Sequence, residues 1–391
     1  MEVADLRRIL TPEGLRLLDD VGDIAATADV LRVVSKLRAA GHDGGLVAAV
    51  LEQSRLRAKA RPKFGDFADR MLFTPDGLEQ ATRLRVAALH AGRFAGAGID
   101  VVADLGCGIG ADSLAMAALD LGVVAVERDE LTAAVASFNL APFPTARVEL
   151  GSAEDADLAG VGGVWLDPAR RNGSGRLTDP GDWSPSLDWA FDLASRLPTG
   201  IKLGPGLPRD LIPDGVEAQW VSVDRDVVEL VLWSGPLARS GVGRAALVLG
   251  AAGPAELTAA ADSPDAEPGD LAEYLLEPDG TVIRARLIGD LARSVDGRML
   301  DPTIAWITLH TPVASPFGQS FRVLERYPLD LKTLKRELRA QGIGTLEIKK
   351  RGVDIDPAQF RTRLALDGDR SATLVLTRIA GSRAAILVER V

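Results

Sequence analysis

The chain has 391 residues, 47% of them apolar, and a formal net charge of −10. This length and composition predict two to three domains with sizeable cores. A single cysteine and three histidines exclude an internal disulfide and argue against a Cys- or His-based metal centre, so no metal is expected.

The sequence predicts neither a secretory leader nor a membrane span. Its first residues lack a basic stretch followed by an apolar one, and no apolar run approaches the roughly 18 residues that a spanning helix needs. We therefore expect a cytoplasmic protein that has no membrane partner.

The first region, residues 1–72, is predicted to be helical. Thr11-Pro12-Glu13 combines an N-cap, a first-turn proline and an early acid, and apolar residues recur at helical spacing from Leu15 onward. A basic stretch, residues 55–63, lies near its end. This stretch fits either a solvated helix face or a surface that steers a polyanion.

Phe73-Thr74-Pro75 follows, and it predicts a short helix capped by Thr74. Two interpretations of Thr74 stay open. It is an ordinary cap, or it begins a helix whose free amides meet the carboxylate of a bound cofactor.

Residues 101–112, VVADLGCGIGAD, form an apolar strand that runs into a glycine-rich turn. A predicted helix follows, and then a strand over 122–126 that ends in Glu127. This order is how an open α/β sheet holds a nucleoside-containing cofactor, with the final acid accepting the ribose hydroxyls. A tight turn without a ligand is the alternative.

The spacing of the glycines indicates which cofactor the turn binds. They alternate evenly, whereas a dinucleotide site uses G-x-G-x-x-G, and Asp104 stands where it can contact an ammonium group. Both features favour S-adenosylmethionine (SAM), which carries no phosphate, over NAD. The turn residues assigned to the cofactor are Gly106, Cys107, Gly108 and Gly110.

The loop after the third strand, which begins at Ser152, is predicted to meet the adenine ring. Ser152 or Glu154 could bond the exocyclic amine of adenine, and Ala153 could offer a backbone donor. Arg128, beside Glu127, is assigned to the same site. Asn139 is interpreted as a helix stop, and Lys202 is given only a minor role in closing over the substrate.

Asp167-Pro168-Ala169-Arg170-Arg171 follows the fourth strand, residues 163–166. Asp167 and a nearby carbonyl could hold the N–H groups of an exocyclic amine and aim its lone pair at a methyl donor. Pro168 fixes the backbone, and Arg170 could grip a phosphate or stack on a base. A plain loop start is the alternative. The strands then continue to a predicted hairpin over 216–233.

The C-terminal part differs in net charge from the rest of the chain. Residues 250–269 are predicted to be a loop or linker, and 271–322 a small mixed unit. From Leu324 onward the chain has 14 Lys/Arg and 9 Asp/Glu, a net of +5, which leaves −15 for the rest.

This tail is predicted to present a basic surface. A helix over 331–340 aligns four cations, and a strand over 345–348 runs into a basic loop. The combination favours binding of phosphate backbones over a merely solvated face. The candidate RNA-binding residues are Lys332, Lys335, Arg336, Arg339, Lys349, Lys350 and Arg351.

Several motifs resemble the class I SAM-dependent methyltransferases, and among them a bacterial group with a C-terminal THUMP-like domain. These motifs are Lys-Ala-Arg-x-Lys-Phe at 59–64, Leu-Glu-Gln-Ala-Thr at 78–82, Asp-Leu-Gly-Cys-Gly-Ile-Gly at 104–110, Asp-Pro-Ala-Arg-Arg at 167–171 and Glu-Ile-Lys-Lys-Arg-Gly at 347–352. The Phe-Thr-Pro segment is similar to that of trimethylguanosine-synthase-like RNA methyltransferases. The resemblance implies cofactor binding by Asp104, the three glycines and Glu127, and an acceptor site at Asp167 and Pro168.

The predicted fold is α/β, a Rossmann-like class I methyltransferase sheet with an N-terminal helical region and a small C-terminal α/β THUMP-like domain. The expected domains are 1–72 (helical), 73–236 (methyltransferase), 237–322 (linker plus a ferredoxin-like unit) and 323–391 (THUMP-like). The expected function is RNA methylation from SAM, with a base exocyclic amine favoured. A non-catalytic RNA-binding protein and a small-molecule methyltransferase are the alternatives.

Overall fold

The computed structural model describes residues 1–22, 27–169, 171–172, 175–176 and 180–391. They divide into two compact units. The first comprises Met1–Lys202 and Trp233–Ala238, and the second comprises Leu203–Leu232 and Arg239–Val391. Within the described residues, no helix is long and apolar enough to cross a membrane.

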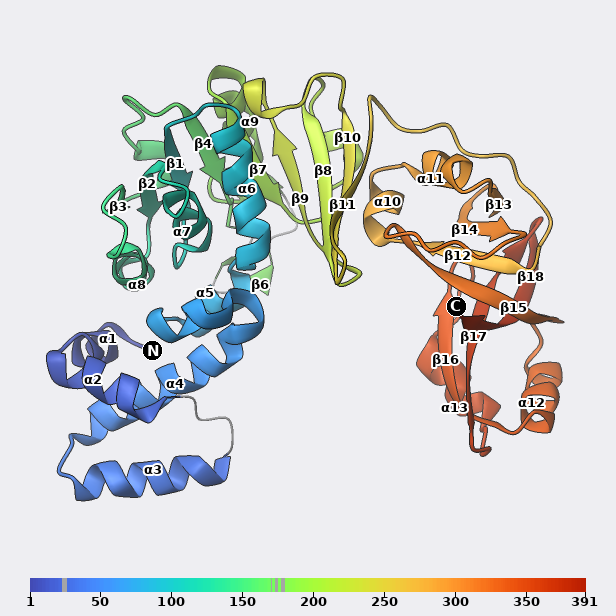
Figure 1. Cartoon of the computed structure of the whole chain (residues 1–391), viewed down its shortest axis with the longest axis horizontal. Helices are drawn as coiled ribbons and strands as arrows, with labels where there is room; N and C mark the ends of the chain where they lie inside the picture. Colours follow the sequence, from blue (N-terminus) through green and yellow to red (C-terminus); the bar gives the residue numbers. More distant parts are fainter. Residues whose placement is uncertain (23–26, 170, 173–174, 177–179) are drawn as a thin grey trace. The chain divides into compact units, whose positions relative to one another are not determined.

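The first unit begins with helices, as the sequence predicts. Thr11 caps the second helix by accepting a hydrogen bond from the Gly14 amide, and Asp43 caps the long fourth helix in the same way. Helices α1 to α3 pack against α4 (Figure 1). The elements are α1 (Val3–Ile9), α2 (Pro12–Val21), α3 (Thr27–Ala39), α4 (Gly44–Phe64), η1 (Gly65–Arg70) and α5 (Pro75–Gln80).

A parallel sheet follows in the order β7-β4-β1-β2-β3, which confirms the predicted Rossmann-like fold. The strands β1, β2 and β4 are mostly buried and rich in valine, as is typical of parallel sheets covered by helices, whereas β3 at the sheet edge has no buried residue. The strands are β1 (Val101–Leu105), β2 (Gly122–Glu127), β3 (Ala146–Leu150), β4 (Gly163–Leu166) and β7 (Thr199–Leu203). The connecting helices are α6 (Leu84–Gly96), α7 (Ala111–Ala117), α8 (Glu130–Leu140) and α9 (Leu187–Arg196).

Short elements lie at the carboxyl ends of these strands. Because the strands are parallel, all their carboxyl ends meet at one edge, where ligands of such sheets bind. The short elements are η2 (Ala153–Asp155), β5 (Arg171–Asn172), β6 (Gly175–Arg176) and η3 (Pro180–Asp182).

The second unit opens with the predicted hairpin. Two adjacent strands are joined by Asp224 and Arg225, which both have positive φ (51° and 74°), as a tight two-residue turn requires. The expected loop at 250–269 is partly wrong, because β11 pairs antiparallel with β10 there. This edge strand is largely exposed and therefore lacks an apolar alternation. The elements are β8 (Glu217–Val223), β9 (Asp226–Trp233), β10 (Arg244–Gly250), β11 (Gly253–Ala259), η4 (Arg209–Leu211) and η5 (Gly235–Leu237).

A larger sheet of the second unit has the order β13-β14-β12-β15-β18-β17-β16. The expected domain boundary at 322/323 falls inside β15, which pairs with β12 on one side and β18 on the other. Residues on both sides of that boundary therefore share one sheet. Its strands are β12 (Tyr274–Pro278), β13 (Arg298–Asp301), β14 (Ile304–Leu309), β15 (Gly318–Pro328), β16 (Ile343–Lys350), β17 (Arg370–Ile379) and β18 (Ser382–Arg390). Its helices are α10 (Gly280–Arg284), α11 (Ile288–Ser294), α12 (Leu331–Ala340) and α13 (Pro357–Leu364).

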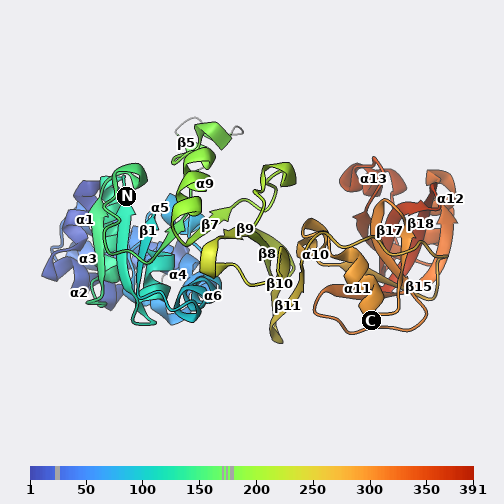
Figure 2. The same cartoon turned by 90° about the horizontal axis from the view of Figure 1, so that it is seen from above.

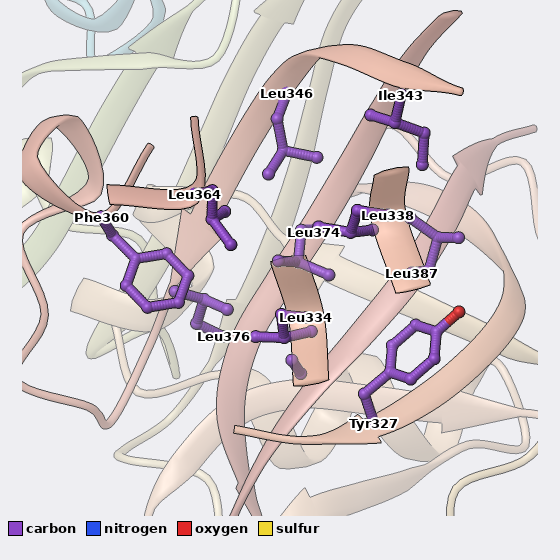
Figure 3. Close-up of a cluster of buried hydrophobic side chains, with 11 residues drawn as sticks. Tyr327, Leu334, Leu338, Ile343, Leu346, Phe360, Leu364, Leu374, Leu376 and Leu387 are labelled. Carbon is purple, nitrogen blue, oxygen red and sulfur yellow. The ribbon is translucent and has the colours of Figure 1, made fainter. Parts of the chain in front are cut away.

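Helices α12 and α13 cover one face of this sheet (Figure 2). Leu334 and Leu338 of α12 and Phe360 and Leu364 of α13 point into a shared apolar cluster with strand residues such as Leu374 (Figure 3). Alternate residues of the same strands face the other way, towards a second cluster that contains Trp306, Phe321 and Val375. The period of two along each strand separates the two faces.

Candidate cofactor and acceptor site

The glycine turn leaves β1 and folds back on β2. The amides of Gly106 and Cys107 donate to the carbonyl of Val126 at 2.9 and 3.1 Å. Gly106, Gly108 and Gly110 have φ values of 85°, 56° and 85°, a left-handed conformation that favours glycine. The alternating glycines of the sequence thus serve the backbone conformation of the turn.

The turn is open at one glycine and packed at another. A Cβ at Gly108 would meet nothing within 4 Å, whereas a Cβ at Gly106 would lie 3.0 Å from the carbonyl oxygen of Asp167. A ligand can therefore approach the backbone at Gly108. The close packing at Gly106 brings the loop after β4 against the turn.

Cys107 lies inside this turn and is buried, and its thiol lies 3.6 Å from the carbonyl oxygen of Gly108. Burial, with the charges of Asp104 and Glu127, raises the pKa of the Cys107 thiol well above its usual value. At neutral pH the thiol is protonated, so it acts as a small apolar residue of the turn.

Glu127 ends β2 and binds the turn. Its Oε2 accepts from the Gly108 amide at 3.0 Å, and its Oε1 accepts from the Asp129 amide at 2.9 Å. Each carboxylate oxygen can accept a second hydrogen bond. The half-buried Glu127 therefore keeps the capacity to accept two ribose hydroxyls.

The predicted adenine loop lies beside Glu127, because the Gly151 amide donates to the Glu127 carbonyl at 3.0 Å. Ser152 and Ala153 follow directly. The Ser152 hydroxyl donates to Asp155 at 2.8 Å, so in this structure it stabilises its own loop. The adenine contacts predicted for these two residues stay predictions.

Asp104 is almost fully buried, with 1% of its surface exposed, and accepts a hydrogen bond from the Ser113 hydroxyl at 2.5 Å. Burial, together with the negative charge of nearby Asp112, raises the pKa of Asp104 to about 8. Asp104 is thus a neutral acid at pH 7 that a cation placed beside it would ionise. This chemistry fits the ammonium group expected of the cofactor.

Asp167 follows β4 and pairs with Lys202 near the end of β7. The Lys202 ammonium lies 2.6 Å from Oδ2 of Asp167, and it also donates to the Thr82 hydroxyl at 3.0 Å. The two side chains are 11% and 29% exposed. The adjacent, parallel strands β4 and β7 place them at the same sheet edge.

A buried hydrogen-bond chain continues behind Lys202. The Thr82 hydroxyl donates to Asp112 at 2.7 Å, and Asp112 also bonds Nδ1 of His90 at 2.8 Å. Burial opposes ionisation of Asp112, but the His90 hydrogen bond and neighbouring charge outweigh it and lower the pKa of Asp112. Sequence reasoning missed Thr82, Asp112 and His90 and undervalued Lys202. The available signal was a lysine at the end of an otherwise apolar strand.

The acceptor loop is tied to the end of β2. Pro168 is buried, and Ala169 exchanges two backbone hydrogen bonds with Ser184. Arg128 donates to the Ser184 hydroxyl at 2.7 Å, so it reaches this loop. Arg170, predicted to contact the substrate, lies outside the described residues.

The segment before the sheet is held by side chains from two helices. Gln53 of α4 bonds both the amide and the carbonyl of Phe73, at 3.0 and 2.7 Å. Asn139 of α8 likewise bonds both groups of Leu72, at 2.8 and 3.1 Å, and donates to the carbonyl of Ile109 in the glycine turn at 2.9 Å. Asn139 lies one residue before the end of α8, in line with its interpretation as a helix stop, and its side chain also links this segment to the turn.

Thr74 comes next and caps α5, because its hydroxyl accepts from the Gly77 amide at 3.0 Å. A Cβ at Gly77 would lie 2.4 Å from the Ile109 side chain, so α5 packs directly on the glycine turn. The structure thus bears out the cap, and a contact of Thr74 with the cofactor stays a prediction.

The basic stretch at 55–63 is divided between surface and interior: Arg55, Lys59 and Arg61 are exposed, and Arg57 and Lys63 turn inward. Arg57 is buried and donates to the Met71 carbonyl at 2.9 Å. Lys63 donates to the carbonyls of residues 78, 79 and 81 at the end of α5, at 2.7 to 2.9 Å. Burial and the charge of Arg83 lower the pKa of Lys63 to about 8. These two cations anchor the segment that leads to the site.

The candidate RNA-binding residues do not form one surface. On α12, Lys332, Arg336 and Arg339 are exposed and Lys335 is half-buried, opposite the leucines of the core. The Arg336 guanidinium also contacts Glu337, and that of Arg339 contacts the Ala365 carbonyl.

Lys349 and Arg351 lie on the other face of the sheet. Lys349 pairs with Glu277 at 2.9 Å, and Arg351 lies 3.9 Å from the same carboxylate. Their side chains also stand over Phe321 and Trp306 of the second apolar cluster. Lys350 is exposed at the end of β16. The expectation that helix and loop act together is therefore wrong for Lys349 and Arg351, because alternate residues of a strand face opposite ways.

Family comparisons agree with this architecture. The THUMP domain-like family model matches residues 318–390, and a model described as Domain of unknown function (DUF8688) matches residues 2–60. Two uncharacterized S-adenosylmethionine-dependent methyltransferases, from Mycobacterium tuberculosis strains CDC 1551 / Oshkosh and ATCC 25618 / H37Rv, are each 32% identical to the chain over 355 residues. The match covers 85% of this chain and 93% of each relative.

A solved structure shares the fold over nearly the whole chain. The crystal structure of a candidate methyltransferase from Porphyromonas gingivalis W83 superposes with a TM-score of 0.69 at 19% sequence identity. The match covers 94% of this chain and 99% of that one.

Proposed function

Because this chain belongs to the S-adenosylmethionine-dependent methyltransferases, we propose that it transfers a methyl group from SAM to RNA, with an exocyclic amine of a base as acceptor. SAM supplies a methyl carbon bonded to a sulfonium, which is an electrophile. The observation that carries the proposal is the packing of the Asp167 backbone on Gly106, which puts a hydrogen-bond acceptor beside the cofactor turn.

We assign the cofactor contacts to the residues that line the turn. Glu127 accepts hydrogen bonds from the ribose hydroxyls, because each of its oxygens can accept one more hydrogen bond besides that from a backbone amide. Asp104 ionises against the cofactor ammonium, and the open backbone at Gly108 admits the ligand. Ser152 and Ala153 meet the adenine.

The acceptor amine is held by Asp167 and the rigid backbone at Pro168. Asp167 accepts a hydrogen bond from an N–H of the amine, and this contact aims the nitrogen lone pair at the methyl carbon. As the N–C bond forms, the C–S bond breaks and its electron pair stays on sulfur, and the amine then loses one proton. Rate enhancement by positioning of this kind is worth several kcal/mol.

RNA is the favoured substrate because the THUMP domain-like stretch carries the exposed cations of α12. Phosphate contacts by such a helix give affinity that falls steeply with salt. Lys332, Lys335 and Arg336 are the residues that we expect to contact the phosphate backbone.

Purified protein, SAM carrying a labelled methyl group and total RNA from a strain that lacks this gene would test the proposal. We expect label in RNA, and mass spectrometry of the digested nucleosides would identify the methylated atom. Asp167→Ala should abolish transfer while the dissociation constant for S-adenosylhomocysteine (SAH) changes little. Binding of SAH without transfer to any RNA would favour a non-catalytic RNA-binding role. Transfer only to small molecules would refute the RNA substrate.

A further inference from the structure

We infer that Lys202 is a positioning residue for methyl transfer, because its ammonium holds Oδ2 of Asp167 and thereby presents Oδ1 to the N–H of the acceptor. This inference rests on the acceptor role proposed for Asp167. It assigns a function to a lysine of the fifth parallel strand that neither the glycine turn nor the Asp-Pro motif includes.

The geometry fixes the lysine from two sides. Its ammonium is 2.6 Å from Asp167 and 3.0 Å from the Thr82 hydroxyl. Thr82 has one proton, which it donates to Asp112 at 2.7 Å, so its lone pair faces the lysine. The order of donors along Lys202, Thr82 and Asp112 is therefore determined.

The end of this hydrogen-bond series that lies farthest from Lys202 is held by packed elements. Asp112 begins α7 and bonds Nδ1 of His90 on α6, and the His90 ring lies 4.3 Å from the ring of Trp165 in β4. A group held by packed helices and strands keeps its rotamer. The flexible four-carbon stem of Lys202 is thus fixed at both its backbone and its ammonium.

Charge favours the same arrangement. Asp112 and Asp167 both lie close enough to influence Asp104, and Lys202 brings positive charge among these three acids. Removing one partner of a partly buried ion pair is costly, since the remaining charge stays uncompensated. Without the ammonium, we expect the Asp167 carboxylate to turn away from the acceptor.

The test compares Lys202→Met and Asp167→Asn, alone and together, in the full chain with labelled SAM and RNA. We expect Lys202→Met to lower kcat by about 100-fold, the typical cost of misplacing a reacting group. The KM for SAM and the dissociation constant for SAH should stay within about threefold, because the lysine acts on the acceptor side. The double variant should be no slower than Asp167→Asn, because the lysine acts only through that aspartate.

Two further variants guard against a general packing effect. Lys202→Arg retains the charge and should recover part of the lost kcat, and Thr82→Val should lower kcat less than Lys202→Met. Lys36→Met, on the exposed face of α3, is the matched control and should leave kcat unchanged. Unchanged kcat in Lys202→Met, or equal loss of SAH affinity, would overturn the inference while leaving the proposed function intact.

If the wild-type chain transfers no methyl group, the proposed function fails, and a second measurement still tests whether Lys202 holds Asp167. Urea unfolding of the same single and double variants gives the coupling between Lys202 and Asp167. Non-additive free energies of unfolding would support a held carboxylate, and additive ones would refute it.

Discussion

Asp104 and Glu127 end or nearly end adjacent strands, yet their surroundings differ. Glu127 is half-buried and accepts hydrogen bonds from two backbone amides. Asp104 is buried, and its burial and the charges of Asp112 and Asp167 raise its pKa to about 8 despite the hydrogen bond from the Ser113 hydroxyl. The sequence pattern alone treats both as simple acids.

The pKa of Asp104 predicts that cofactor binding releases a proton. At pH 7 the free protein holds Asp104 protonated, and an ammonium placed beside it favours the ionised form. Affinity for SAH should therefore rise as the pH approaches about 8 and level off above it, because the ionised fraction grows over that range.

Calorimetry of SAH binding at pH 7, in buffers of different ionisation enthalpy, measures this release. We expect close to one proton released by the wild type and none by Asp104→Asn. Binding without any proton exchange in the wild type would mean that Asp104 does not meet the ammonium.

At the scale of elements, α4 and α8 hold the segment before the sheet through its backbone. Gln53 and Asn139 each bond both polar groups of one residue, Phe73 and Leu72, and Asn139 alone also bonds Ile109 in the glycine turn. We therefore expect Gln53 to contribute to stability alone, and Asn139 to contribute both to stability and to the cofactor site.

Gln53→Ala and Asn139→Ala should each lower the free energy of unfolding by about 2 to 4 kcal/mol, because each leaves buried backbone groups without partners. Only Asn139→Ala should also weaken SAH binding, since it frees the turn at Ile109. Urea unfolding and calorimetry would measure both quantities. Equal SAH affinity in the two variants would contradict a link between Asn139 and the turn.

The two basic groups of the second unit should respond differently to neutralisation. Lys332→Gln with Lys335→Gln and Arg336→Gln should weaken RNA binding and reduce its salt dependence, with little change in stability. Lys349→Gln should instead lower stability by about 1 to 3 kcal/mol, because Glu277 is only 13% exposed and loses its nearest cation. Filter binding at several salt concentrations and urea unfolding would distinguish them. An RNA-binding loss in Lys349→Gln equal to that of the α12 variant would refute this division.

Local patterns predicted the elements well where they were strong. The apolar runs of β1 and β4 and the cationic face of α12 gave the right structure, because each follows from the period of its own element. Exposed β11 had no such pattern. The pair of Lys349 with Glu277 joins residues 72 apart, and the pair of Lys202 with Asp167 joins residues 35 apart. Such pairs depend on strand order and on which face of a strand each side chain occupies.

At the scale of the whole molecule, the C-terminal sheet combines residues on both sides of the boundary expected at 322/323. β15 lies between β12 and β18, and the cluster around Trp306 and Phe321 includes Val375 of β17. A chain that ends at residue 322 would keep the β15 residues that pair with β12, but it would expose the edge of β15 that pairs with β18 and half of an apolar cluster.

We expect this truncated chain to aggregate, because exposed strand edges and apolar surface favour association. Size-exclusion chromatography and thermal unfolding would measure the outcome against the full chain. A monomer that melts cooperatively would show that residues 239–322 fold without the end of β15 and the last three strands. Point variants on α12 leave this sheet intact, so they are a better test of RNA binding than truncation.

The same shared strand bears on attempts to transplant the THUMP domain-like part into a host enzyme. The stretch recognised as THUMP domain-like, 318–390, starts at the first residue of β15 and omits β12 to β14. A graft cut there would carry Lys349 and Arg351 without Glu277, which would leave Arg351 without its carboxylate partner and Lys349 with only the more distant Glu347. We expect such a graft to carry more uncompensated positive charge than one that starts near residue 271 and keeps Glu277.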